Sequence, residues 1–295
     1  MPENLYELLK RIINPFIFGN IIISLCTLAL FLETYLQLGT TIKFDGLAFL
    51  VFFATLSLYN VHRLLGIIRI QKEDYGEITG WAANHRFTLF MLALIGAGGV
   101  AFFVFQTSLL IFGILFFLGA ISLLYELPVI RHNQRFQRLR NLWIHKAFMI
   151  TTVWTVATAV LPAVNAGISL LDYGVWLIVT ERMLFIFLLA LCFDARDIEF
   201  DTRDGLKTIP IRYGTAFTQT LYKIIIAAFV VVAIINYIIL DSNYGIGIAM
   251  IISGCVSFIV ISKTQQRKSD YYYIFLVDGM MVLQFFLVTI FSGIG

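Results

Sequence analysis

Long apolar stretches are the feature that most limits what this chain can fold into. Of its 295 residues, 60% are hydrophobic and only 13% are charged. A transmembrane helix needs about 20 apolar residues, and lipid offers no partners for free backbone groups, so such stretches must be helical. Nine of them lie near residues 14–37, 45–62, 87–106, 108–127, 142–163, 173–193, 215–240, 244–262 and 271–292. The sequence therefore predicts an all-α integral membrane protein, a bundle of about nine transmembrane helices forming one domain over residues 1–295.

The basic residues predict the orientation of this bundle. Cytoplasmic loops carry more Lys and Arg than the opposite loops, and here alternate loops are basic while those between them contain little besides Lys43. We expect a multi-pass protein of a bacterial-type plasma membrane with a cytoplasmic N-terminus. A polar cytoplasmic cap is expected from residues 62–86, 128–141 and 194–214. The net charge of +3 follows from this bias and predicts no nucleic-acid partner.

A run of acidic residues follows the sixth apolar stretch. Asp194, Asp197 and Asp201 have the spacing i, i+3, i+7, which places them on one stripe of a helix that turns about 100° per residue. Gly205 and Pro210 then predict the helix end. Clustered carboxylates beside water are typical of Mg²⁺ sites, where the ion bridges to substrate phosphates. The alternative is a solvated helix end whose acids are neutralised by neighbouring basic residues.

The same run resembles the second acidic motif of the UbiA-type intramembrane prenyltransferases. That motif is D-x-x-D-x-x-x-D followed by G-x-x-T-x-P, and here it reads Asp194-x-x-Asp197-x-x-x-Asp201, then Gly205-x-x-Thr208-x-Pro210. A second block resembles the family segment Y-x-x-P-x-x-R-x-K and reads Tyr125-x-x-Pro128-x-x-Arg131, with Arg140-Asn141 further on. The resemblance covers nearly the whole chain. It implies transfer of a prenyl group from an allylic isoprenyl diphosphate to a hydrophobic acceptor, with Mg²⁺ as cofactor on the three aspartates as catalytic and metal-binding residues.

The first acidic motif of that family is missing. Where relatives carry N-D-x-x-D-x-x-x-D, this chain retains only Asn60, because Val61, Leu64 and Ile68 replace the three acids. Arg63 lies three residues after Asn60 on the same helical face, and guanidinium groups bind phosphate oxygens in a planar fork. We therefore expect Asn60 and Arg63 to bind the diphosphate from the side opposite the aspartates. Alternatively, Arg63 simply marks the cytoplasmic boundary of its helix.

Further residues, most of them basic, are candidates for substrate binding. Lys207, Arg138 and Arg140 lie in the predicted cap, and Tyr125 belongs to the second family-like block. Lys146, near the cytoplasmic end of the fifth stretch, either reaches a phosphate or extends to the membrane surface.

An ionisable residue in the sixth stretch is a further candidate. Glu181 lies near the middle of this predicted membrane span, where charged groups are costly. It either orients an acceptor head group or is neutralised within the packing of the helices. The sequence favours neither role.

Three other functions remain open from the sequence. A non-catalytic relative that binds a polyprenyl lipid or a quinone would explain the missing first motif. A small transporter would explain the intramembrane charges but predicts inverted repeats and broken helices. A lipid-phosphate enzyme would use the same Asp and Mg²⁺ chemistry with a different acceptor. The enzyme interpretation leads, because packing alone does not explain three aspartates on one face.

Overall fold

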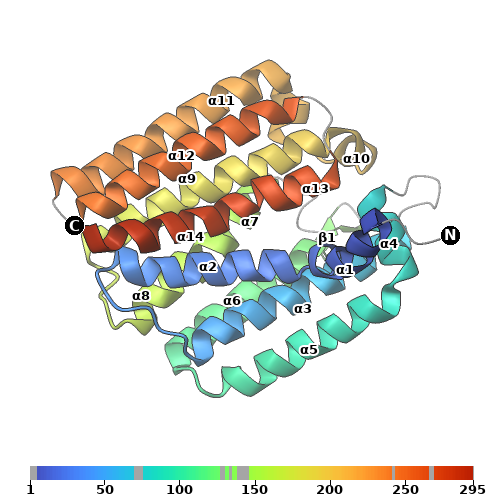
Figure 1. Ribbon diagram of the computed structural model, residues 1–295. Helices are drawn as coiled ribbons and strands as arrows, with labels where there is room; N and C mark the ends of the chain where they lie inside the picture. The colour runs from blue at the N-terminus through green and yellow to red at the C-terminus, as the bar shows by residue number, and fades with distance from the viewer. Residues whose placement is uncertain are drawn as a thin grey trace.

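The helices lie side by side in one bundle (Figure 1). The structure is a computed structural model that describes residues 5–69, 76–126, 130–132, 135–137, 146–240, 243–265 and 269–294. Each of the nine predicted stretches contains helix within these residues, which confirms the all-α membrane bundle. The elements are α1 (Leu5–Phe18), α2 (Ile21–Gln37), α3 (Gly46–Arg69), α4 (Glu77–Asn84), α5 (Arg86–Val104), α6 (Leu109–Glu126), β1 (Ile130–His132), β2 (Arg135–Gln137), α7 (Lys146–Thr155), η3 (Val156–Val160), α8 (Leu161–Asn165), α9 (Tyr173–Arg196), α10 (Ile198–Arg203), α11 (Ile209–Ala233), η4 (Ile234–Ile239), α12 (Tyr244–Ser262), η5 (Lys263–Gln265), α13 (Asp270–Tyr272), η6 (Tyr273–Val277), α14 (Gly279–Phe291) and η7 (Ser292–Ile294).

Most of these helices are suited to a membrane by their length and composition. Seven qualify among the described residues, and the count rises to eight if the pair α1 and α2, bent by 54°, is one span. The apolar part of α6, Leu109–Tyr125, is shorter than the others. The chain is therefore an integral multi-pass membrane protein, although two of the nine predicted spans are a bent pair and a short helix rather than simple straight crossings.

The bend between α1 and α2 is held by a buried asparagine pair. Asn20 has a left-handed backbone conformation, with φ 62°, and its Nδ2 donates to Oδ1 of Asn60 at 3.1 Å. Nδ2 of Asn60 donates in turn to the carbonyl oxygens of Gly19 at 3.0 Å and Leu56 at 2.8 Å. Because Asn60 belongs to α3, these hydrogen bonds fix the bend against the neighbouring helix.

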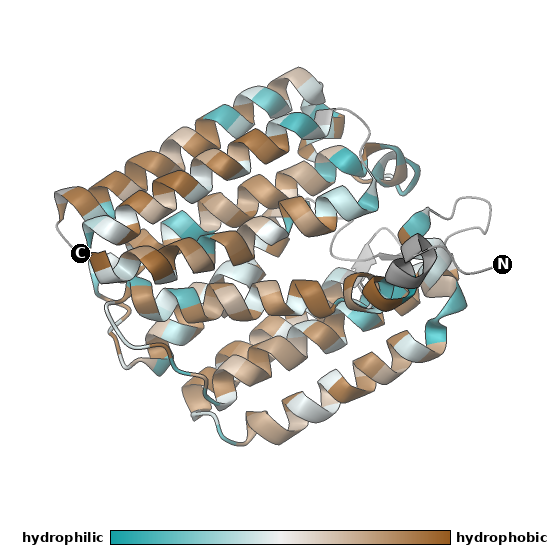
Figure 2. Cartoon of the chain, viewed as in Figure 1, coloured by the Kyte–Doolittle hydropathy of each residue, from teal (hydrophilic) through white to brown (hydrophobic). Residues whose placement is uncertain are grey.

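Polar residues outside the bundle interior lie mainly on short elements at one end. Figure 2 shows brown along most of the helices and teal at α4 and α10. The strands β1 and β2 pair in an antiparallel hairpin, with Ile130 opposite Gln137. This hairpin is the one departure from the all-α prediction in the part of the chain that the structure describes.

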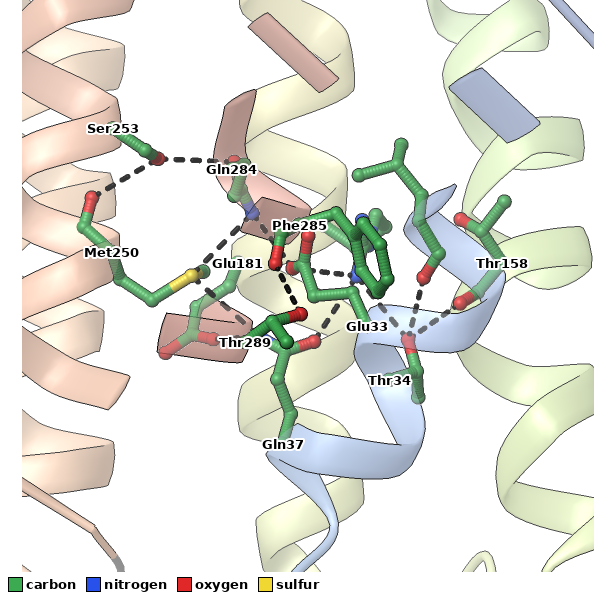
Figure 3. A network of polar contacts seen from close by, with 12 residues as sticks. Glu33, Thr34, Gln37, Thr158, Glu181, Met250, Ser253, Gln284, Phe285 and Thr289 are labelled. Carbon is green, nitrogen blue, oxygen red and sulfur yellow. Dashed lines mark hydrogen bonds and ion pairs between the residues drawn. The ribbon is translucent and has the colours of Figure 1, made fainter. Parts of the chain in front are cut away.

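A second polar cluster lies inside the bundle, and Figure 3 shows its residues on α2, η3, α9, α12 and α14. Arg182 and Glu33 form an ion pair of 3.0 Å, and both side chains are at most 1% exposed. Gln37 accepts from Nη2 of Arg182 at 3.1 Å and donates to Glu181 at 3.3 Å. Tyr237 also donates to Glu181, at 2.9 Å. We call this cluster the interior network; it joins helices that are distant in the sequence.

Candidate functional site

The acidic run forms where α9 ends. Asp194 lies in the last turn of α9, Asp197 separates α9 from α10, and Asp201 lies within α10. The backbone of Asp197 leaves the helical region, with φ −89° and ψ 10°, so the two helices are bent rather than continuous. Gly205 then takes a left-handed conformation with φ 70°, which a glycine adopts without strain. The chain turns here, as the Gly signal predicted, whereas Pro210 lies in the first turn of α11 and does not end the acidic helix, which stops at Arg203.

One ammonium group lies among the three carboxylates. Nζ of Lys146, the first residue of α7, is 3.5 Å from Oδ1 of Asp194, 3.4 Å from Oδ2 of Asp197 and 3.1 Å from Oδ2 of Asp201. The side chains of Asp194 and Asp201 are 1% and 3% exposed, and that of Lys146 is 14% exposed. Lys146 therefore turns toward the acids and not toward the membrane surface. We call these four residues the Asp–Lys cluster.

Arg196 adds a second cation at this cluster. Helical periodicity predicts that it faces away from the aspartates, yet its Nε lies 2.7 Å from Oδ1 of Asp197. The bend at Asp197 explains the difference, because the straight-helix geometry no longer applies there. The guanidinium also lies over the rings of Phe193 and Tyr273, at 4.9 and 5.1 Å from their centroids. Burial alone would raise the pKa of the Asp197 carboxyl, but Arg196 and Lys146 lower it below its ordinary value.

The cluster borders a cavity of about 290 Å³. Arg63 of α3 also lines this cavity, and its Nη2 donates to Oδ1 of Asn20 at 2.8 Å. The charged lining residues are Arg63, Lys146, Asp194, Arg196, Asp197 and Asp278. We call this space the charged cavity. It combines fixed cations and acids, and its remaining lining is largely apolar.

Two further cavities, of about 340 and 320 Å³, adjoin the charged cavity. Tyr59 and Trp154 line all three spaces. Their rings are nearly perpendicular, and Nε1 of Trp154 donates to the hydroxyl of Tyr59 at 3.1 Å. The 320 Å³ cavity is lined almost entirely by apolar residues, for example Val100, Phe116 and Ala157. Two aromatic rings thus form a shared wall between the charged cavity, the partly polar 340 Å³ cavity and the apolar 320 Å³ cavity.

The predicted residues of α3 and α6 occupy different positions around these cavities. Arg63 and Tyr125 both line the 340 Å³ cavity. Asn60 is completely buried and does not line any of the three cavities, because its amide is engaged at the bend between α1 and α2. Its predicted contact with diphosphate stays a prediction.

Of the other predicted residues in the described part of the chain, Lys207 and Glu181 do not line the charged cavity. Lys207 is exposed beyond the turn that follows α10. Glu181 belongs to the interior network, 13 residues before Asp194 on α9, which corresponds to about 20 Å along the helix. Arg138 and Arg140 lie outside the described residues.

Several cavity residues were not predicted as site residues. Asp278, between η6 and α14, could have been predicted from the sequence. An acidic residue inside an apolar stretch is energetically unfavourable and often indicates a functional site. Tyr59 and Trp154 could not have been predicted in this way, because aromatic residues are common throughout membrane helices. Only the tertiary structure shows that the ring of Tyr59 on α3 meets that of Trp154 on α7.

The fit of Mg²⁺ to the cluster depends on Lys146. Three carboxylates supply the oxygen ligands that Mg²⁺ prefers, and neither oxygen of Asp194 accepts a hydrogen bond from any described residue. The ammonium, however, stands between the carboxylates. In the arrangement described, no group of three or more His, Cys, Asp or Glu residues among those described is placed to hold a metal ion. The ligand chemistry suits Mg²⁺, and the ion fits here only when the ammonium has moved.

Comparison with solved structures defines the class of fold as that of the UbiA-type intramembrane prenyltransferases. The solved chain that it resembles is described as digeranylgeranylglyceryl phosphate synthase in membranes. The match has a TM-score of 0.56 and 12% sequence identity, and it covers 90% of this chain and 92% of the solved one. No family model and no curated protein matches the sequence. At this identity the likeness establishes the fold, and the function must be argued from the site.

Proposed function

We propose that this protein transfers a prenyl group from an allylic isoprenyl diphosphate to a hydrophobic acceptor within the membrane. The observation that carries the proposal is that the charged cavity shares its wall of Tyr59 and Trp154 with two neighbouring cavities, a partly polar one of about 340 Å³ and an apolar one of about 320 Å³. An isoprenyl diphosphate has the same division into a strongly charged head and an apolar tail. The volumes also lie within the usual range of small-molecule pockets.

The fixed cations of the charged cavity would bind the diphosphate. Arg63 and Lys146 line it from α3 and α7, and Arg196 lines it from α9. Guanidinium groups suit phosphate because their planar fork matches two oxygens at once, whereas an ammonium acts as a point charge. Arg63 thereby keeps the role that the sequence suggested for it, opposite the aspartates.

Cleavage of the allylic C–O bond leaves both electrons on the diphosphate oxygen and a positive charge on the allylic carbon. The cations stabilise the departing diphosphate, while the apolar cavities exclude water from the allylic cation. Tyr59 and Trp154 present aromatic faces where head and tail compartments meet, which suits a developing cation. The acceptor then bonds to the allylic carbon and loses a proton.

We further propose that Mg²⁺ enters together with the diphosphate, as its salt. The aspartates of the cluster would hold it after the ammonium of Lys146 has turned toward phosphate. When bound, Mg²⁺ supplies Lewis acidity to the leaving group and fixes its orientation. This arrangement reconciles the oxygen ligands of the cluster with the ammonium that stands among them.

One observation favours a second candidate, a protein that binds a polyprenyl lipid without reacting it. The face of α3 that carries acids in the family is apolar here, and Leu64 packs against the cluster of Ile67, Ala82 and Leu89. On this face of α3, apolar residues that pack in the core therefore stand where members of the family carry metal ligands. A binding protein needs the head and tail cavities but no second metal site.

The test compares binding and turnover in purified protein. Isoprenyl diphosphates of graded length are offered with Mg²⁺ to the wild type, to Asp197→Asn and to Asp204→Asn, whose carboxylate lies outside the charged cavity. We expect the wild type and Asp204→Asn to bind and to release diphosphate when acceptors are added, and Asp197→Asn to lose turnover. Binding without turnover for every acceptor would favour the lipid-binding protein. Absence of binding in the wild type would overturn both candidates.

A further inference from the structure

We infer that Lys146 is the resident cation of the three aspartates, so that the wild-type protein takes no divalent metal at this cluster until a diphosphate arrives. The statement about metal alone is independent of the proposed function. The statement about diphosphate rests on the proposed function. The inference concerns a residue that neither the acidic motif nor the family resemblance assigns to metal binding.

The distances support this assignment. Nζ of Lys146 lies within 3.1–3.5 Å of an oxygen of each aspartate. A divalent ion that used the same three carboxylates would have to stand about 2.0–2.1 Å from their oxygens if it were Mg²⁺. Such an ion would meet the ammonium at close range, and two cations in that space repel each other. The cluster therefore holds one of them at a time.

Burial keeps the ammonium in this position. Asp194 and Asp201 are almost fully buried, and helices α7 and α9 pack against each other along their length. Without a cation, two buried carboxylates would face each other and a third would lie beside them. Such an arrangement is costly, because charges removed from water need an opposite charge nearby. Lys146 supplies that charge in the metal-free protein.

The charge balance of the cluster leaves it net negative, so the aspartates attract the metal of a metal–diphosphate complex, while the phosphates of that complex need the cations of the charged cavity. Three aspartates contribute −3, and Lys146 and Arg196 contribute +2, so −3 + 2 leaves −1. Both oxygens of Asp194 accept no hydrogen bond from the described residues, so this carboxylate retains ligand capacity. The long stem of a lysine allows its ammonium to turn. Because Lys146 also lines the charged cavity with Arg63, its new partner is the phosphate.

The test uses Mn²⁺, whose free ion gives an electron paramagnetic resonance signal that is lost on binding. Purified protein in detergent is titrated with Mn²⁺ without diphosphate, as wild type, Lys146→Met and Lys263→Met. Lys263 is an exposed lysine at the end of α12 and serves as the matched control. We expect Lys146→Met to gain one Mn²⁺ site at least about tenfold tighter than any in the wild type, a change of about 1.4 kcal/mol. Lys263→Met should behave as the wild type.

Two further measurements keep the inference falsifiable if Lys146→Met folds poorly. The wild type and Asp194→Asn are both titrated with Mn²⁺ in the absence of diphosphate. If the wild type binds one Mn²⁺ and Asp194→Asn does not, the inference is overturned, and no lysine variant is needed for this result. Because diphosphate itself binds Mn²⁺ in solution, the wild type and Asp194→Asn are then dialysed to equilibrium against the same Mn²⁺ and inorganic diphosphate, and we expect excess Mn²⁺ on the protein side for the wild type and not for Asp194→Asn. No more Mn²⁺ on the wild type in the presence of diphosphate than on Asp194→Asn would also overturn it.

The outcomes separate this inference from the proposed function. If prenyl transfer is absent but Lys146→Met gains a Mn²⁺ site, the proposed function fails and the role of Lys146 stands. If prenyl transfer occurs and the wild type already binds Mn²⁺ alone as tightly as Lys146→Met, the role of Lys146 fails and the function stands.

Discussion

Replacing Arg182 tests the interior network most directly. Its side chain is 1% exposed, and its Nη2 lies 3.0 Å from Glu33, 3.2 Å from Thr34 and 3.1 Å from Gln37. Arg182→Met keeps an apolar stem and removes the charge. Glu33 is then left as a buried carboxylate whose remaining hydrogen bond comes from Gln284 at 2.9 Å.

The expected cost follows from the loss of this partner. Removing one member of a buried ion pair destabilises by about 3–5 kcal/mol, whereas three hydrogen bonds between membrane helices at about 0.6 kcal/mol each would contribute only about 2 kcal/mol. At about 2–4 °C per kcal/mol, the melting temperature should fall by about 6–20 °C. Thermal unfolding of the purified protein, followed by circular dichroism and size-exclusion chromatography, measures this shift.

A double variant separates charge from packing. Glu33→Gln combined with Arg182→Met removes both charges, so we expect it to be more stable than the sum of the single variants by about 1–3 kcal/mol. Arg212→Met, at an exposed arginine of α11, is the control and should change stability by about 0.5 kcal/mol or less. Additive single effects, or a shift for Arg182→Met no larger than for Arg212→Met, would refute the reasoning.

Three other substitutions test the packing around the cavities. A Cβ at Gly96 would lie 2.6–2.8 Å from backbone atoms of α3, so Gly96→Leu should separate α3 from α5 and lower Tm, while Gly98→Leu, with open space around it, should not. Asn60→Leu leaves the carbonyl of Gly19 without its buried donor, and we expect about 1–3 kcal/mol of lost stability in thermal unfolding; an unchanged Tm would show that the bend does not need this bond. Trp154→Ala joins the three cavities, so competition binding should shift toward longer isoprenyl tails, and an unchanged length preference would contradict the proposed tail path.

The helices were predictable because lipid leaves the backbone no alternative. Apolar runs of sufficient length must become helices, and all nine runs contain helix in the described residues. The bend at Asn20 was missed because its cause lies 40 residues away, in the amide of Asn60. The shortness of α6 and the hairpin of β1 and β2 were missed for a different reason, since hydropathy sets neither helix ends nor short polar elements.

In the candidate site too, some features depend on residues close together in the sequence and others on contacts between distant helices. The spacing of Asp194, Asp197 and Asp201, with the Gly and Pro that follow, is local, and the sequence by itself determined an acidic cluster at a helix end. Only the tertiary structure decided that Lys146 stands among these acids, since it packs α7 against α9 across 51 residues of sequence. Sequence spacing describes one helix at a time, whereas the cation that neutralises a buried acid is chosen by whichever helix lies beside it.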